Sequence, residues 1–159
     1  MEPQILDSNA RKLVGMRITT SLSDDKTLAL WQGFMPRRHE VKNRKDDGYY
    51  SVQVYKGGLN TNSFNDETLF EKWAAIEVAD LDVLPEGMES LLLPEGKYAV
   101  FLHKGPVSAF RKTATYIYTE WLPKSGFELD TRPHFEFMGA RYLGHEHPDS
   151  EEEVWVPVR

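Results

Sequence analysis

The sequence predicts an α+β protein with an antiparallel sheet and two helices packed on it. Two observations support this class. Short segments that alternate apolar and polar residues, as half-buried strands do, are separated by segments with apolar residues at helical spacing. The order strand, helix, strand, strand also occurs twice along the 159 residues. This duplication predicts a tandem βαββ repeat with pseudo-twofold symmetry, formed by halves of about 1–84 and 85–159 within a single domain over 1–159.

The first half is predicted to contain a strand, a helix and two further strands, at residues 12–20, 23–36, 49–56 and 72–78. Ser23-Asp24-Asp25 offers an N-cap and acidic groups for the first turn of the helix, and Pro36 marks its end. Tyr50, Val52 and Val54 alternate with polar residues, which indicates a strand. The polar stretch between the last two strands is predicted to be a loop.

The second half is predicted to repeat this order, at residues 98–103, 105–123, 135–140 and 154–158. Pro106 stands at a tolerated early position of the helix, and Pro123 and Gly126 end it. The stretch from Trp31 to Pro36 matches that from Tyr118 to Pro123 in character, which supports the repeat. The seam between two such halves is a natural place for a ligand pocket.

Composition excludes several classes of function. The chain has no cysteine, so it has no disulfide, no thiolate metal site and no cysteine nucleophile. A net charge of −6 argues against a general nucleic-acid-binding protein. No signal peptide and no apolar stretch of about 18 residues is present, so we expect a cytoplasmic protein without a membrane span. His145-Glu146-His147 lacks a third metal ligand nearby, so we expect neither metal nor cofactor.

The residue with the most chemical interest is Glu136, which stands between Phe135 and Phe137 in an apolar strand. If its side chain points inward, the ionised carboxylate loses hydration and needs a partner, such as a cationic ligand. If it points outward, it is an ordinary solvent-facing residue of an alternating strand. The tryptophans have the same two interpretations, as core residues or as walls on which a flat ligand stacks.

Six segments together resemble the GyrI-like small-molecule-binding family, which includes effector-binding domains of AraC-type and MerR-type regulators: 13–17, 93–101, 103–106, 120–127, 133–137 and 152–158. The resemblance implies the tandem βαββ fold found from the repeat. In multidrug-sensing members, an acidic residue buried among aromatics recognises lipophilic cations, and Glu136 matches that position best. The resemblance also suggests that Trp121 and Trp155 line the pocket. The candidate ligand contacts are therefore Glu136, Trp121, Trp155, Glu120, Trp31, Phe34 and Tyr118.

The leading hypothesis is a stand-alone module that binds a lipophilic, aromatic, cationic compound by stacking and by charge neutralisation at Glu136. Because the chain starts almost at its first strand, we expect no DNA-binding domain in it. A second hypothesis is a hydrolase of reactive small molecules that uses Glu136, with Glu120 beside it. A third is a gyrase-inhibitor-like module whose protein partner contacts the acidic segment 146–153. Binding is favoured over catalysis.

Overall fold

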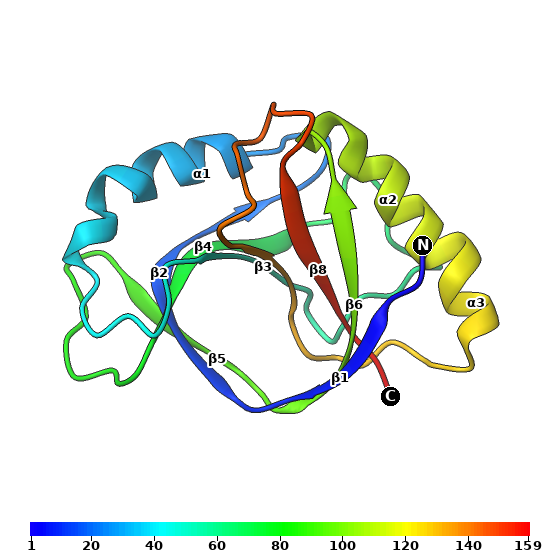
Figure 1. The fold of residues 1–159 in the computed structure, drawn as a ribbon, viewed down its shortest axis with the longest axis horizontal. Helices are drawn as coiled ribbons and strands as arrows, with labels where there is room; N and C mark the ends of the chain where they lie inside the picture. Colours follow the sequence, from blue (N-terminus) through cyan, green and yellow to red (C-terminus); the bar gives the residue numbers. More distant parts are fainter.

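The computed structural model describes residues 1–159 as a curled antiparallel sheet of eight strands with helices on one of its faces (Figure 1). The strands are β1 Gln4–Ser8, β2 Arg11–Thr20, β3 Tyr49–Val54, β4 Phe70–Val78, β5 Glu89–Leu93, β6 Gly96–Lys104, β7 His134–Met138 and β8 Glu151–Pro157. The α-helices are α1 Thr27–Phe34, α2 Phe110–Tyr116 and α3 Leu122–Ser125. Shorter turns are the 3-10 helices η1 Met35–Glu40 and η2 Val107–Ala109 and the π-helical turn η3 Ile117–Trp121.

The predicted fold class is confirmed, with one strand more in each half than the sequence predicted. β1 and β5 make each half a ββαββ unit. Each extra strand pairs with the other half, β1 with β6 and β5 with β2. Neither segment alternates clearly between apolar and polar residues. In β5, for example, three leucines follow one another from Leu91 to Leu93, and Leu92 is 57% exposed. Their strand conformation therefore depends on the partner strand more than on their own residue pattern.

The strand order β1-β6-β8-β7-β3-β4-β2-β5 has the symmetry of the repeat. Exchanging each strand with its counterpart in the other half, β1 with β5 and so on to β4 with β8, returns the same order reversed. The counterparts β3 and β7 lie at the centre and pair with each other. The pseudo-twofold axis therefore passes between these two strands.

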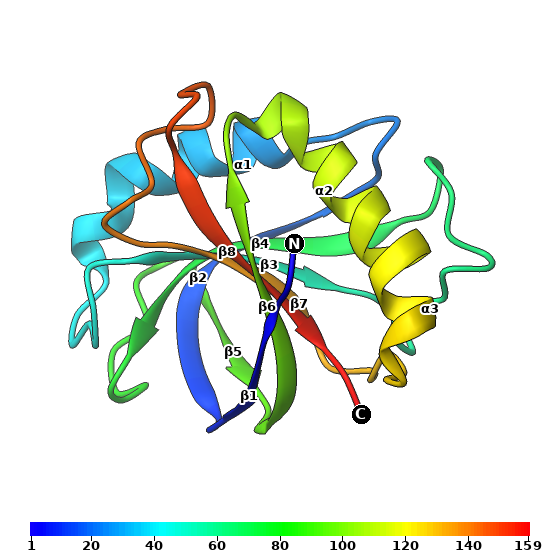
Figure 2. The same ribbon diagram turned by 45° about the vertical axis from the view of Figure 1, so that its right-hand side comes forward.

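The two outer ladders share one register, which curls the sheet. Gln4 pairs with Val100 and Gly15 pairs with Glu89, and the register is unchanged between these ends. β1 and β2 thus act as one long strand that bends and runs along β5 and β6, as the lower rim in Figures 1 and 2 shows. Gly15 fits here because a Cβ would lie 2.0 Å from the Ala74 carbonyl oxygen.

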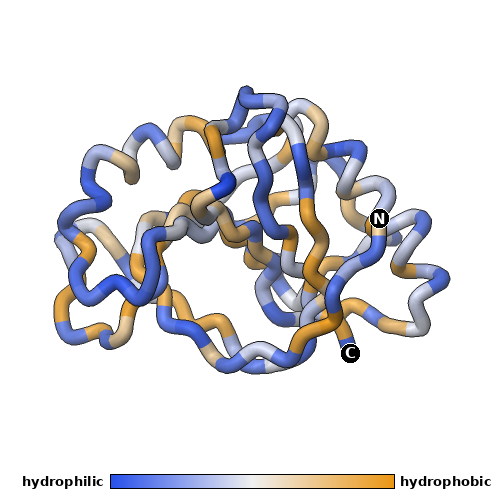
Figure 3. Tube along the Cα trace, viewed as in Figure 1, coloured by the Kyte–Doolittle hydropathy of each residue, from blue (hydrophilic) through white to orange (hydrophobic).

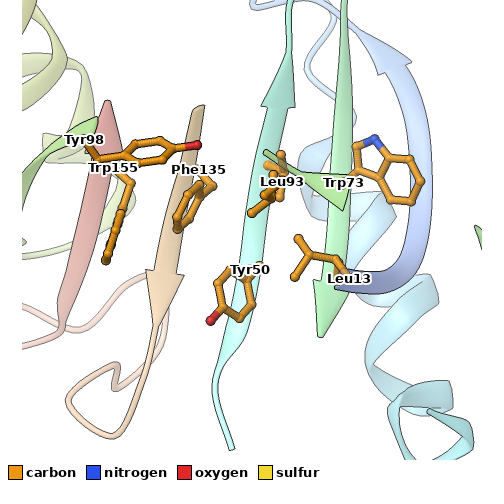
Figure 4. Close-up of a cluster of buried hydrophobic side chains, with 9 residues drawn as sticks. Leu13, Tyr50, Trp73, Leu93, Tyr98, Phe135 and Trp155 are labelled. Atoms are coloured by element: carbon orange, nitrogen blue, oxygen red, sulfur yellow. The ribbon is translucent and has the colours of Figure 1, made fainter. Parts of the chain in front are cut away.

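The core has three parts, one inside the curl and one under each helix. Inside the curl, aromatic and aliphatic side chains from both halves meet (Figure 4), and the Phe135 and Trp155 rings stack with centroids 5.0 Å apart. On the other face, Leu30 and Phe34 of α1 pack on β2 and β4. Ile117 of the second helical segment packs on β6 and β8. Alternate residues of each strand therefore serve different cores.

The more hydrophilic parts of the trace include the segment after α1 and the loop before β8 (Figure 3). None of the helices combines the length and the apolar character needed to cross a bilayer.

Candidate functional site

The centre of the helix-bearing face lies on the pseudo-twofold axis. The pair Tyr50–Ala75 corresponds to Phe135–Trp155 in the other half, which fixes the counterparts along these four strands. By the same correspondence Ser51 is the counterpart of Glu136, and these two residues also pair with each other. The axis therefore runs between Ser51 and Glu136.

The charged residues nearest this axis are also counterparts. The correspondence that relates Ala75 to Trp155 relates Lys72 on β4 to Glu152 on β8. Each lies one strand outside the central pair, toward opposite ends of the face. Both point to the helix-bearing face, because Lys72 is two residues from Ala74 and Glu152 is two residues from Val154, and side chains two apart on a strand share a face. A symmetric frame thus carries a cation on one side and a carboxylate on the other.

Glu136 points inward and has partners within the protein. It is 9% exposed, which excludes the solvent-facing alternative. Gln53 Nε2 donates a hydrogen bond to Glu136 Oε1 at 2.9 Å. Lys72 Nζ lies 3.6 Å from the same oxygen, in an ion pair whose side chains are 9% and 12% exposed. A buried carboxylate requires such partners, since burial removes its hydration.

Glu152 is less well satisfied. It lies diagonally across from Glu136 on the neighbouring strand, because Glu136 pairs with Val154. Burial and the nearby charge of Glu136 raise the Glu152 pKa to about 7, and Lys72 opposes this rise. The Glu152 side chain is partly buried, and no hydrogen bond or ion pair of the chain holds its carboxylate, so the carboxylate is unpartnered.

Two equivalent aromatic contacts flank this centre. Trp31 of α1 meets Tyr49 edge to face, with centroids 6.2 Å apart. Tyr118 meets His134 at 6.3 Å, and its hydroxyl is hydrogen-bonded to His134 Nδ1 at 3.1 Å. Tyr49 and His134 are counterparts, and so are Trp31 and Tyr118 in the helix match of the sequence. Tyr118 lies in η3, and such a π-helical turn within a helix is often found at functional sites.

His134 is neutral at ordinary pH. Burial, with the Arg132 charge as a smaller cause, lowers its pKa to about 3. Its Nε2 is buried without a hydrogen-bond partner. Burial also raises the pKa of Tyr55, whose ring stands edge to face on His134 at 5.2 Å. This end of the cluster therefore offers polar but uncharged groups beside Lys72.

Not all of the predicted ligand contacts join this cluster. Glu136 and Tyr118 belong to it, and Trp31 stands at its edge on α1. Phe34 is fully buried in the core beneath α1. Trp155 lies on the opposite face, inside the curl, because it is one residue from Val154 on a strand whose side chains alternate.

Trp121 and Glu120 come together elsewhere, in a hollow of about 420 Å³ beside β1 and α3. Trp121 stacks there on Phe127, with centroids 6.2 Å apart, and its ring meets that of Phe101 nearly at right angles, with centroids 5.0 Å apart. A second hollow, of about 340 Å³, lies near Gly57 and Asp130. Neither hollow includes Glu136 or Glu152. The candidate site is therefore defined by its charged residues and by the strand register that brings them together, and not by the volume of a hollow.

The sequence prediction missed Gln53, Lys72 and Glu152. A signal for two of them was present in the repeat: Lys72-Trp73-Ala74 and Glu152-Glu153-Val154 stand at equivalent places in the two halves. Reading the last strand in register with its counterpart would have placed Glu152 on the face of Glu136. With one lysine against two carboxyl groups, the cluster has a net negative charge when both carboxyls are ionised, and this charge can hold a ligand cation.

The comparisons with known proteins agree with this fold. The family model described as GyrI-like small molecule binding domain matches residues 1–159. The transcriptional regulator BrlR of Pseudomonas aeruginosa is 30% identical over 158 residues, which are 99% of this chain and 56% of that protein. The chain thus spans little more than half of the regulator's length.

Solved structures with a similar fold include two of related kinds. A structure of SAV2435 bound to tetraphenylphosphonium has a TM-score of 0.75 at 17% identity, covering 100% of this chain and 94% of that chain. The C-terminal domain of EcmrR has a TM-score of 0.70 at 13% identity, with 99% and 97% of the two chains covered. At these identities the likeness concerns the fold.

Proposed function

This chain belongs to the family of GyrI-like small molecule binding domains, and we propose that it binds lipophilic aromatic cations at the centre of its helix-bearing face. The single observation that carries the proposal is a pair of carboxyl groups on neighbouring strands, with Glu136 buried beside Lys72 and Glu152 partly buried without a partner. We also propose that residues 1–159 form a single domain, because residues of both halves contribute to the site.

Charge and aromatic surface support an aromatic cation as the ligand. The carboxylates attract a cation strongly where water is excluded, and a delocalised organic cation loses little hydration on entering such a site. Trp31 and Tyr118 stand on the helices at its two ends, and aromatic faces attract cations by about 0.5–2 kcal/mol. That the related fold of SAV2435 binds tetraphenylphosphonium supports the same ligand class for this chain.

Isothermal titration calorimetry with two probes of equal shape tests the proposal. Tetraphenylphosphonium is a cation, and tetraphenylborate is an anion of nearly the same size. We expect the chain to bind the cation at least about tenfold more tightly than the anion, a difference of about 1.4 kcal/mol. Equal affinities, or no binding of the cation, would refute a site built on charge.

A matched pair of variants locates the binding. Glu136→Gln combined with Glu152→Gln removes both carboxylates with little change of shape, and we expect it to abolish the preference for the cation. Glu120→Gln removes an exposed carboxylate of the hollow that contains Trp121, and we expect it to leave the affinity unchanged. Weaker binding to Glu120→Gln, with the preference for the cation kept in the double variant, would place the ligand in that hollow.

A hydrolytic activity is a second candidate, favoured by the unlike environments of the two carboxyl groups. With a pKa of about 7, Glu152 is partly protonated at neutral pH and could donate a proton to a leaving oxygen, while Glu136 stands nearby. A strained ring such as the epoxide of styrene oxide would then open to a diol by addition of water. Formation of the diol by the wild-type chain but not by Glu152→Gln, followed by chromatography, would establish this activity.

A further inference from the structure

We propose that Glu152, and not Glu136, receives the charge of the ligand, and that Lys72 is a built-in competitor that keeps Glu136 neutralised. This assignment rests on the proposed function, since it concerns the same site. It follows from three features: the partners of Glu136, the lack of partners of Glu152, and the symmetry that relates Glu152 to Lys72.

The first feature is that Glu136 already has its counter-charge. Its Oε1 accepts a hydrogen bond from Gln53 at 2.9 Å and lies 3.6 Å from Lys72 Nζ. A ligand cation that took this position would have to displace the Lys72 ammonium, which is 9% exposed. Leaving a buried charge without its partner is strongly unfavourable, so the ion pair persists when a cation binds nearby.

The second feature is the unpartnered state of Glu152. The strand register brings it to the same face as Glu136 and one strand further out. Burial and the nearby charge of Glu136 raise its pKa to about 7, so its surroundings in the protein disfavour the ionised form. A cation placed beside this carboxylate relieves that cost, whereas a cation beside Glu136 relieves none. The gain in charge stabilisation on binding is therefore concentrated at Glu152.

The third feature is the opposite sign of the charges at equivalent positions. Lys72 and Glu152 lie at opposite ends of the face, on either side of the axis between Ser51 and Glu136. A ligand bound over the axis meets a positive end and a negative end. The Glu152 end is also the end of Tyr49, since Tyr49 pairs with Met138, which is two residues from Glu136.

Different groups stand at the two ends of the face. Trp31 packs on Tyr49 at the Glu152 end. The Arg44 guanidinium already covers one face of that tyrosine, with its Cζ 5.0 Å from the ring centroid, so this face is closed to the ligand's cation and Trp31 is the aromatic ring left to it at this end. Tyr118 and His134 stand at the Lys72 end. We therefore expect the cationic centre near Glu152 and the uncharged rings of the ligand toward Tyr118.

A charge-neutral double variant separates the two carboxylates. Glu136→Gln combined with Lys72→Gln removes the ion pair without changing the net charge of the site. If Glu152 receives the ligand's charge, this variant keeps the wild-type Kd for tetraphenylphosphonium within about threefold at about pH 8, where Glu152 is ionised. Glu152→Gln alone weakens binding about tenfold to a hundredfold, as expected for loss of a charged contact of 1.5–3 kcal/mol.

Lys72→Gln alone provides an independent readout. The substitution removes the internal counter-charge of Glu136 and adds no charge. We therefore expect tetraphenylphosphonium to bind this variant about tenfold more tightly than it binds the wild type. All variants are compared by calorimetry after urea unfolding confirms that each is folded. Glu152→Gln removes only an unpartnered carboxylate, so it tests the assignment even if the double variant fails to fold.

The possible outcomes are distinct. No binding of tetraphenylphosphonium to the wild-type chain refutes the proposed function, and this assignment with it. Binding that survives Glu152→Gln but is lost in the double variant refutes the assignment alone, since Glu136 would then receive the charge. Lys72→Gln that weakens binding refutes the role of Lys72 as a competitor.

Discussion

Replacing Glu152 by glutamine should make the protein more stable, and only above a certain pH. In the folded chain the Glu152 pKa is about 7, compared with 4.5 for a free glutamate side chain. The folded state therefore binds more protons than the unfolded state between these two values. As the pH rises through this window, the free energy of unfolding of the wild type falls, and the loss is complete above about pH 7.

The size of the effect follows from the width of the window. From 4.5 to about 7 is roughly 2.5 pH units, and each unit corresponds to about 1.4 kcal/mol. The wild type is thus destabilised by up to about 3 kcal/mol at pH 8, and partial exposure of Glu152 makes this an upper limit. Glutamine keeps the shape of the side chain and does not ionise, so Glu152→Gln should recover this free energy.

Urea unfolding at a series of pH values measures the effect. The difference in free energy of unfolding between Glu152→Gln and the wild type should be near zero at pH 4 and grow to its full value by pH 8. Glu120→Gln, at an exposed position, serves as the control and should show no such trend. A difference that is independent of pH, or a variant less stable than the wild type at pH 8, would refute the reasoning.

Further predictions concern acid stability, the sheet and its inner face. Because the His134 pKa is lowered to about 3, unfolded chains bind the proton more readily, so the free energy of unfolding should fall as the pH drops below about 6.5, measured by urea titration. Gly15→Ala should destabilise the fold by several kcal/mol or prevent folding, as read by circular dichroism, since a Cβ would overlap the Ala74 carbonyl. Phe135→Leu should reduce stability by about 1–3 kcal/mol while leaving the affinity for tetraphenylphosphonium within about twofold, because its ring lies inside the curl.

The central strands and both helices could be predicted because their residue patterns reflect which side is buried. The strand around Tyr50 and Val52 alternates, and these residues lie inside the curl while Ser51 and Gln53 face the helices. β1 and β5 could not be predicted in this way. Each is an outer segment that becomes a strand by pairing with the opposite half, which local sequence does not report.

The candidate site was predictable in part. Glu136 stood out because it is a charged residue between two phenylalanines, and it does lie buried at the centre of the sheet. Its partner Lys72 could not be identified, since the pair joins strands far apart in the sequence. The aromatic residues were the least predictable: Trp155 and Phe34 are apolar enough for a pocket or a core, and only the register places them in cores.

The most direct test of the central claim is a crystal structure of the chain with tetraphenylphosphonium. We expect the phosphorus centre over β7 and β8 on the helix-bearing face, closer to the Glu152 carboxylate than to that of Glu136, with the Lys72–Glu136 pair intact. A ligand found instead in the hollow of Trp121 and Phe127, or inside the curl against Trp155, would contradict the claim.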